Sequence, residues 1–269
     1  MKERLRKIID EIYKYNSPEM PFLALNVQKD DVFDLVVFAP TYTPNKLKMD
    51  RFCEINELMI YSSVSSYLLK RNNHKILWIV VGASDSNQAD YLALVAEYKF
   101  KKILFIGAVG ALKADAEVGD IFTPTYSING GMVNTYLKES IKDFVPFEKY
   151  SLEDKETTKE ILNIAKKRNI EVKEGSVFCT PSVSLEYIHL NEIRSFNTDL
   201  IEMETATFMA FANLMEKPAA ILLVVSDNSC NGKPIIGRNK ELEDKYNKGR
   251  REYLASLIID LVDWKSNNQ

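Results

Sequence analysis

The chain has 269 residues, of which 46% are hydrophobic and 27% are charged, a composition typical of an ordinary globular protein. Its net charge is −3, and acidic and basic residues are mixed along it without a basic stripe, which argues against nucleic acid as a partner. The longest apolar runs, 76–83 and 219–225, are far too short to span a bilayer, and the first residues do not form a signal peptide. We therefore expect a cytoplasmic protein that binds neither nucleic acid nor a membrane.

The cysteine and histidine content narrows the possible chemistry. The three cysteines are odd in number and widely spaced, which suits a reducing compartment better than a disulfide framework. Only two histidines, His74 and His189, are present, too few for a usual zinc site or a Ser-His-Asp triad. The sequence also lacks the GxGxxG, GxxxxGK[ST], HExxH, CxxC and GxSxG signatures. We expect no metal and no bound organic cofactor.

Short β-like runs alternate with helical ones along the chain, starting with an amphipathic helix in the first 16 residues. Strands are predicted at 33–39, 76–81, 102–106, 172–179 and 219–225. Further helices are predicted at 87–98, 152–168, 185–194, 205–217 and 240–264. Two hairpins are predicted, one within 53–67 and one formed by 120–127 and 133–137 with a turn at Gly130-Gly131, and a loop is predicted at 41–51.

This alternation predicts an α/β fold. A central mixed β-sheet would be flanked by helices on both faces, as a three-layer sandwich. We expect one domain spanning residues 1–269, with residues 1–20 as an N-terminal helical extension.

Two acidic segments carry the strongest chemical signal. Glu202 and Glu204 are two residues apart, so in an extended backbone their side chains share a face, and a helical pattern follows them. Asp227 comes where the apolar run 219–225 stops. Because ligands in open α/β sheets gather at the carboxyl ends of strands, both segments are expected to deliver carboxylates to the same edge.

These segments resemble the nucleoside phosphorylase and nucleosidase superfamily, which includes the purine nucleoside and uridine phosphorylases. In that family a Glu-Met-Glu segment holds a ribose and a later Ser-Asp carries the acid for the leaving group. The likeness extends to the strand 33–40, the strand and turn 76–83, the strand and Gly-x-x-Gly segment 101–112, and Val118-Gly119-Asp120-Ile121. It covers about residues 33–262, and the order and spacing of the motifs make it more specific than any one of them.

The resemblance implies an enzyme of the pentosyltransferase type. The implied reaction is cleavage of the N-glycosidic bond of a nucleoside, with purines favoured and inorganic phosphate as co-substrate, giving free base and ribose 1-phosphate. It also implies a homo-oligomer. A nucleosidase with water as the acceptor, or a catalytically silent nucleoside-binding domain, remains an alternative.

Site residues follow from matching these motifs. Glu204 is expected to accept hydrogen bonds from the ribose diol, and Met203 to pack against sugar or base. Glu202 is expected to help order the site, and the alternative is a carboxylate that is solvated or that only supports the residues touching the ligand. Asp227, beside Ser226, is expected to protonate a purine ring nitrogen, which requires a pKa raised by burial. The alternative for Asp227 is a helix or turn cap.

Other candidate contacts are expected around this centre. Asn228 could donate its amide to the base, and Phe178, Val183 or Tyr187 could pack on it. Gly82 and Ser84 resemble the loop beside the sugar, although capping of the next helix by Ser86 or Asp85 is the favoured explanation for that cluster.

An anion is expected at Gly107 and Ala108, where the resembling enzymes bind phosphate through backbone N–H groups. However, Phe105 and Ala108 stand where those enzymes have an arginine and a serine. A cation could instead come from a neighbouring subunit or from this chain, where the candidates are Lys46, Lys48, Arg51 and Arg238. The alternative is that Gly107 and Gly110 only permit a tight strand-to-helix turn.

Overall fold

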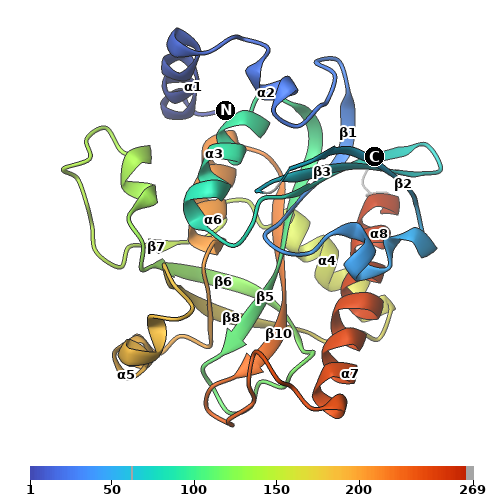
Figure 1. Ribbon diagram of the computed structural model, residues 1–269, viewed down its shortest axis with the longest axis vertical. Helices are drawn as coiled ribbons and strands as arrows, with labels where there is room; N and C mark the ends of the chain where they lie inside the picture. Colours follow the sequence, from blue (N-terminus) through green and yellow to red (C-terminus); the bar gives the residue numbers. More distant parts are fainter. Residues whose placement is uncertain (62, 265–269) are drawn as a thin grey trace.

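The computed structural model describes residues 1–61 and 63–264. Its strands are β1 (Val32–Ala39), β2 (Glu54–Ile60), β3 (Ser65–Arg71), β4 (His74–Val80), β5 (Lys99–Ala111), β6 (Ile121–Asn129), β7 (Lys149–Tyr150), β8 (Val172–Cys179), β9 (Leu200–Glu202) and β10 (Ala219–Asn228). They pair into one mixed sheet in the order β10-β6-β8-β9-β5-β1-β4-β3-β2, with β7 beside β6 (Figure 1).

Half of this sheet closes on itself. Strand β10 pairs in parallel with β5 and antiparallel with β6, so β5, β9, β8, β6 and β10 form a ring. From β5 the sheet continues through β1 and β4 into the antiparallel strands β3 and β2. The ring brings the ends of β5, β9 and β10 together, which positions the site described below.

Helices cover both faces of the sheet, as predicted. On one face lie α1 (Glu3–Tyr15), α2 (Met20–Leu23), α3 (Asp85–Val95) and α6 (Thr205–Met215), and on the other lie α4 (Glu156–Lys167), α7 (Lys240–Lys248) and α8 (Ala255–Asp263) (Figure 1). Alternate residues of β1 supply the two cores: Val36 and Phe38 face the first layer, and Leu35 and Val37 the second. The remaining helix, α5 (Leu190–Ser195), packs through Ile193 on a smaller cluster.

The N-terminal helix belongs to the main core. Leu5 and Ile9 of α1 are buried in the same cluster as residues of α3 and α6. The backbone N–H of Lys2 also donates to the carbonyl of Leu214, at 2.7 Å, near the end of α6. The apolar face predicted from the sequence therefore packs against the domain.

One predicted hairpin is wrong. Residues Val133–Leu137 form a 3₁₀ helix, and β6 pairs instead with β7 at Ser127 and Ile128. The reason is that both edges of β6 are already occupied, by β8 along its length and by β10 and β7 at its two ends. The part of this edge next to the predicted turn is therefore taken by β7, which leaves it closed to a strand at 133–137.

The alternative of a tight turn at Gly107–Gly110 is also wrong, because β5 runs straight through these residues to Ala111. Strand β10 pairs with β5 over this stretch and keeps it extended. The two glycines make room for neighbouring side chains: the ring of Phe105 lies over Gly107 and the carboxyl of Asp227 over Gly110.

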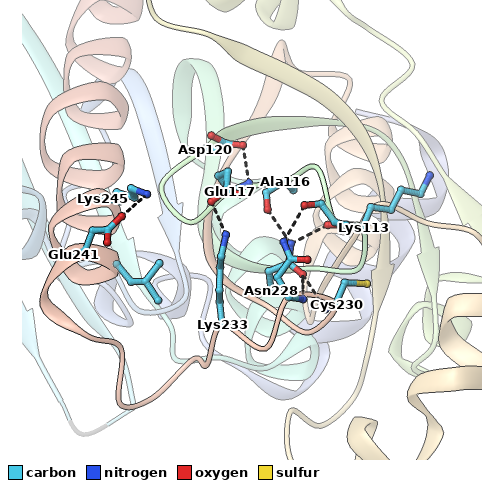
Figure 2. Close-up of polar contacts among 12 residues, drawn as sticks. Lys113, Ala116, Glu117, Asp120, Asn228, Cys230, Lys233, Glu241 and Lys245 are labelled. Atoms are coloured by element: carbon cyan, nitrogen blue, oxygen red, sulfur yellow. Dashed lines mark hydrogen bonds and ion pairs between the residues drawn. The ribbon is translucent and has the colours of Figure 1, made fainter.

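The loop after β5 is tied to the end of β10 by Asn228 (Figure 2). Its side-chain amide donates to the carbonyls of Lys113 and Ala116, both at 2.8 Å, and its side-chain oxygen accepts from the N–H of Cys230 at 2.8 Å. Farther along the loop, Gly119 has φ +95° and no room for a Cβ, which would lie 2.4 Å from the carbonyl oxygen of Lys245. These contacts fix β10 relative to α7.

Candidate active site

A cleft of about 250 Å³ opens at the carboxyl ends of the central strands. Segments far apart in the chain form its walls, including the ends of β1, β5, β9 and β10 and the loop after β8. The sequence-predicted residues that line it are Ala108, Val183, Tyr187, Glu202, Met203, Glu204, Ser226, Asp227 and Arg238. The two acidic segments thus open onto one cavity.

Glu202 is held by hydrogen bonds on both carboxyl oxygens. Its Oε2 accepts from the N–H of Glu204 at 2.7 Å and of Thr205 at 3.0 Å, so it caps the start of α6. Its Oε1 accepts from the hydroxyl of Thr205 at 2.7 Å and the thiol of Cys179 at 2.9 Å. The side chain is only 7% exposed, and these bonds make it a rigid support for the residues that follow it.

Glu204 is buried in a different way. It is 5% exposed, and within the described residues its Oε1 has no hydrogen-bond partner. Burial, and next the charge of Glu202, raise the pKa of Glu204 well above its usual value. A neutral carboxyl there can both donate and accept a hydrogen bond, which suits a ligand with hydroxyl groups.

Asp227 lies at an irregular point of β10, where the pairing with β5 shifts register between Val225 and Asp227. Its Oδ1 accepts from the hydroxyl of Ser226 at 2.5 Å. Burial raises the pKa of Asp227, although the Ser226 hydrogen bond and the charge of Arg238 oppose the shift. The side chain caps neither a helix nor a turn, so the capping alternative is wrong.

Five sequence-predicted contacts do not line the cleft. The Asn228 side chain is fully used in holding the loop described above. Phe178 points into an aromatic cluster, with ring centroids 5.2 Å from Phe196. A Cβ on Gly107 would meet Phe105 and Leu223, so this position faces the core rather than the cleft.

The other two are Gly82 and Ser84. Ser84 is the N-cap of α3, with its hydroxyl accepting from the N–H of Asn87 at 3.4 Å. The cap expected at Ser86 or Asp85 therefore falls at Ser84, and Ala83 is the residue of this turn that lines the cleft.

Arg238 is a cation in the cleft wall, and its Nε and Nη1 donors are engaged. Its Nη1 donates to the carbonyls of Ser226, at 3.0 Å, and Ile235, at 2.8 Å, and its Nε to Glu243 at 3.0 Å. Its guanidinium also lies over the ring of Tyr246, 4.4 Å from the centroid. The other candidate cations, Lys46, Lys48 and Arg51, do not line the cleft.

Sequence reasoning missed one titratable residue of the site. Glu186 follows β8 by seven residues and lines the cleft beside Tyr187. Burial, and next the charge of Asp227, raise the pKa of Glu186 to about 7. No local pattern could have found it, because its position depends on the path of the irregular loop after β8.

Neither a metal cluster nor a membrane span is found in residues 1–61 and 63–264. Their His, Cys, Asp and Glu side chains include no group of three that could hold a metal ion. None of their helices has the length and apolar character needed to cross a bilayer.

The chain is similar to several known proteins. A sequence model of the phosphorylase superfamily matches residues 62–258. The DeoD-type purine nucleoside phosphorylase of Buchnera aphidicola is 26% identical over 241 residues, covering 87% of this chain and 98% of that protein. That of Brevibacillus brevis is 27% identical over 140 residues, or 52% of this chain and 57% of that protein.

Two solved structures share the fold. Purine nucleoside phosphorylase from Toxoplasma gondii, in complex with immucillin-H, gives a TM-score of 0.69 at 16% identity, covering 88% of this chain and 92% of that one. The 5'-methylthioadenosine/S-adenosyl homocysteine nucleosidase of Campylobacter jejuni gives 0.66 at 17% identity, covering 85% and 98%. The predicted mixed α/β architecture is thereby confirmed.

Proposed function

The chain belongs to the phosphorylase superfamily, and from that membership and its cleft we propose that it cleaves the N-glycosidic bond of a purine nucleoside. One observation carries the proposal: Glu204 and Asp227, a carboxyl suited to hydroxyl groups and an acid with a raised pKa, open onto the same cleft.

The two carboxyls would act at opposite ends of the nucleoside. Glu204 binds the ribose diol through its unpartnered Oε1, and Glu202 holds the backbone of Glu204 in position. Asp227 transfers its proton to a purine ring nitrogen as the bond breaks, so that the base leaves neutral. The sugar then carries oxocarbenium character, and when water adds to it, the proton that the water releases returns the ionised Asp227 to its acid form.

We propose water as the acceptor. Among the described residues that line the cleft, Arg238 is the only one with a cationic side chain. Arg238 is already paired with Glu243 and two carbonyls. A phosphate dianion is costly to bury without a charged partner, whereas water is not.

Phosphate is the second candidate acceptor, as the sequence resemblance implies. Arg238 favours it, since this guanidinium lines the cleft and could exchange its carbonyl partners for an anion. The named activity of the Buchnera relative, a phosphorylase, also favours it.

The test is to incubate the protein with a panel of purine nucleosides, with and without phosphate, and to measure free base and the sugar product. Base release at the same rate in both conditions, with free ribose as product, supports hydrolysis. Release that requires phosphate and yields ribose 1-phosphate overturns the choice of water but keeps the glycosidic cleavage. If Asp227→Asn leaves the rate unchanged, the assignment of the acid is wrong. Binding of nucleosides without any release favours a silent binding domain.

A further inference from the structure

Glu186 gives the base end of the cleft a second carboxyl. It begins the single 3₁₀ turn Glu186–His189 and lines the cleft together with Val183 and Tyr187. Its side chain is half-buried, and within the described residues its carboxyl makes no hydrogen bond or ion pair. A glutamate that only served solubility would extend into water or pair with a surface lysine.

Glu186 and Asp227 are two carboxyls of one cleft. Both side chains line the same cleft, and after burial the charge of Asp227 is the cause that raises the pKa of Glu186. Like charges in a confined site resist full ionisation, so such a pair tends to keep one proton between its members. Arg238 is paired with Glu243, and its charge only partly opposes the raised pKa of Asp227.

A carboxyl pair with one proton presents one donor and one acceptor. The edge of a purine that carries the N7 nitrogen also carries the substituent at position 6. A 6-aminopurine shows an acceptor (N7) and a donor (the amine) on that edge, whereas a 6-oxopurine shows two acceptors. Only the 6-aminopurine complements a singly protonated carboxyl pair.

We propose that Glu186 is a specificity residue, that its carboxylate accepts a hydrogen bond from the exocyclic amine, and that the substrate class is the 6-aminopurine nucleosides. This inference rests on the proposed function, because it takes Asp227 as the group that protonates the ring nitrogen. With a 6-oxopurine, the Glu186 carboxylate would face the lone pairs of a carbonyl oxygen, which is repulsive.

The test compares the full-length protein with Glu186→Gln. Base release from adenosine and inosine gives kcat/KM, and calorimetry gives the affinities for free adenine and hypoxanthine. Glu186→Gln should lower the preference for the 6-amino compound roughly ten- to hundredfold in both measurements, since a charge-assisted hydrogen bond is lost. Glu192→Gln is the matched control, because Glu192 is exposed, does not line the cleft, and within the described part of the chain forms its ion pair with His189 alone.

The binding readout separates this inference from the proposed function. If adenine is preferred in binding and the preference falls in Glu186→Gln, the specificity role is supported even when no nucleoside is cleaved, and only the proposed reaction fails. If the protein cleaves nucleosides but Glu186→Gln keeps the 6-amino to 6-oxo ratio, the specificity role is overturned and the reaction stands. Preference for hypoxanthine, or binding of neither base, by the unchanged protein also overturns it.

Discussion

The carboxyl of Asp227 rests against the backbone of Gly110. A Cβ at position 110 would lie 3.0 Å from Oδ2 of Asp227 and 3.0 Å from a methyl carbon of Ile201, which is closer than side chains normally approach. Glycine at this position of β5 therefore gives the proposed acid the space it occupies in the cleft. The same residue type three positions earlier, Gly107, accommodates the Phe105 ring instead.

We expect Gly110→Ala to reduce kcat/KM for base release by about tenfold or more, because the added methyl displaces the Asp227 carboxyl by a few tenths of an ångström or more. Gly107→Ala is the matched control, since its methyl would meet the Phe105 ring on the core side and should lower the melting temperature while activity is kept. Steady-state kinetics and thermal unfolding of both variants check this. Full activity in Gly110→Ala would contradict it.

Glu204→Gln should weaken nucleoside binding without affecting free base. The amide keeps the volume of a carboxyl whose pKa burial raises, so we expect unfolding free energies within about 1 kcal/mol of each other. Loss of the carboxyl at the ribose should lower kcat/KM for nucleosides roughly tenfold or more. Kinetics, calorimetry with free base and urea unfolding are the measurements. Equal losses of nucleoside and base affinity would show that Glu204 does not act at the sugar.

Asn228→Ala should affect stability rather than specificity. It leaves the carbonyls of Lys113 and Ala116 without their side-chain donor, and we expect a loss of about 2–4 kcal/mol in unfolding free energy. The comparison is Asn231→Ala, which removes a single exposed bond to the carbonyl of Ala114 and should cost about 1 kcal/mol. Urea unfolding measures both. If Asn228→Ala changes the ratio of kcat/KM between two nucleosides, this expectation is contradicted and Asn228 acts in base recognition.

Glu186 should make the protein less stable as the pH rises. Its pKa is about 7 in the folded chain against an ordinary value of 4.5, so between these values the folded state holds more proton than the unfolded state, and raising the pH favours unfolding. We expect this effect to be about 1–2 kcal/mol for a half-buried group. It should be absent in Glu186→Gln. Urea unfolding at pH 5 and pH 7.5 measures the difference, with Glu192→Gln as control, and identical pH dependence in all three proteins would exclude it.

Sequence patterns predicted strands and helices correctly where the conformation depends on neighbouring residues. The strand at Val172–Cys179 was predicted to the residue, and the strand starting at Ala219 and the helix starting at Thr205 were predicted from their first residue, because periods of two and 3.6 are set by the backbone itself. The neighbouring acids at 202 and 204 were likewise predicted to serve one site. There Glu202 acts as a cap and Glu204 faces the cleft.

Sequence patterns gave wrong predictions where the conformation of a segment depends on contacts with distant parts of the chain. Residues 133–137 have a β-like composition but find no free strand edge, and Gly107–Gly110 resembles a turn but is held straight by β10. Phe178 was expected to pack on the base, but its ring packs against the rings of Phe147 and Phe196 from other segments.

The amino-acid order by itself determined most of the helices and strands, the mixed α/β class and the acids at the ends of two strands, since each depends on residues within a few positions of one another. The tertiary structure alone decided that Glu204, Asp227 and Glu186 share a cleft, that Asn228 holds a loop, and that the sheet closes between β5 and β10. The physical reason is that these relationships depend on which strand edges pair and in what register, a property of segments more than a hundred residues apart in the chain.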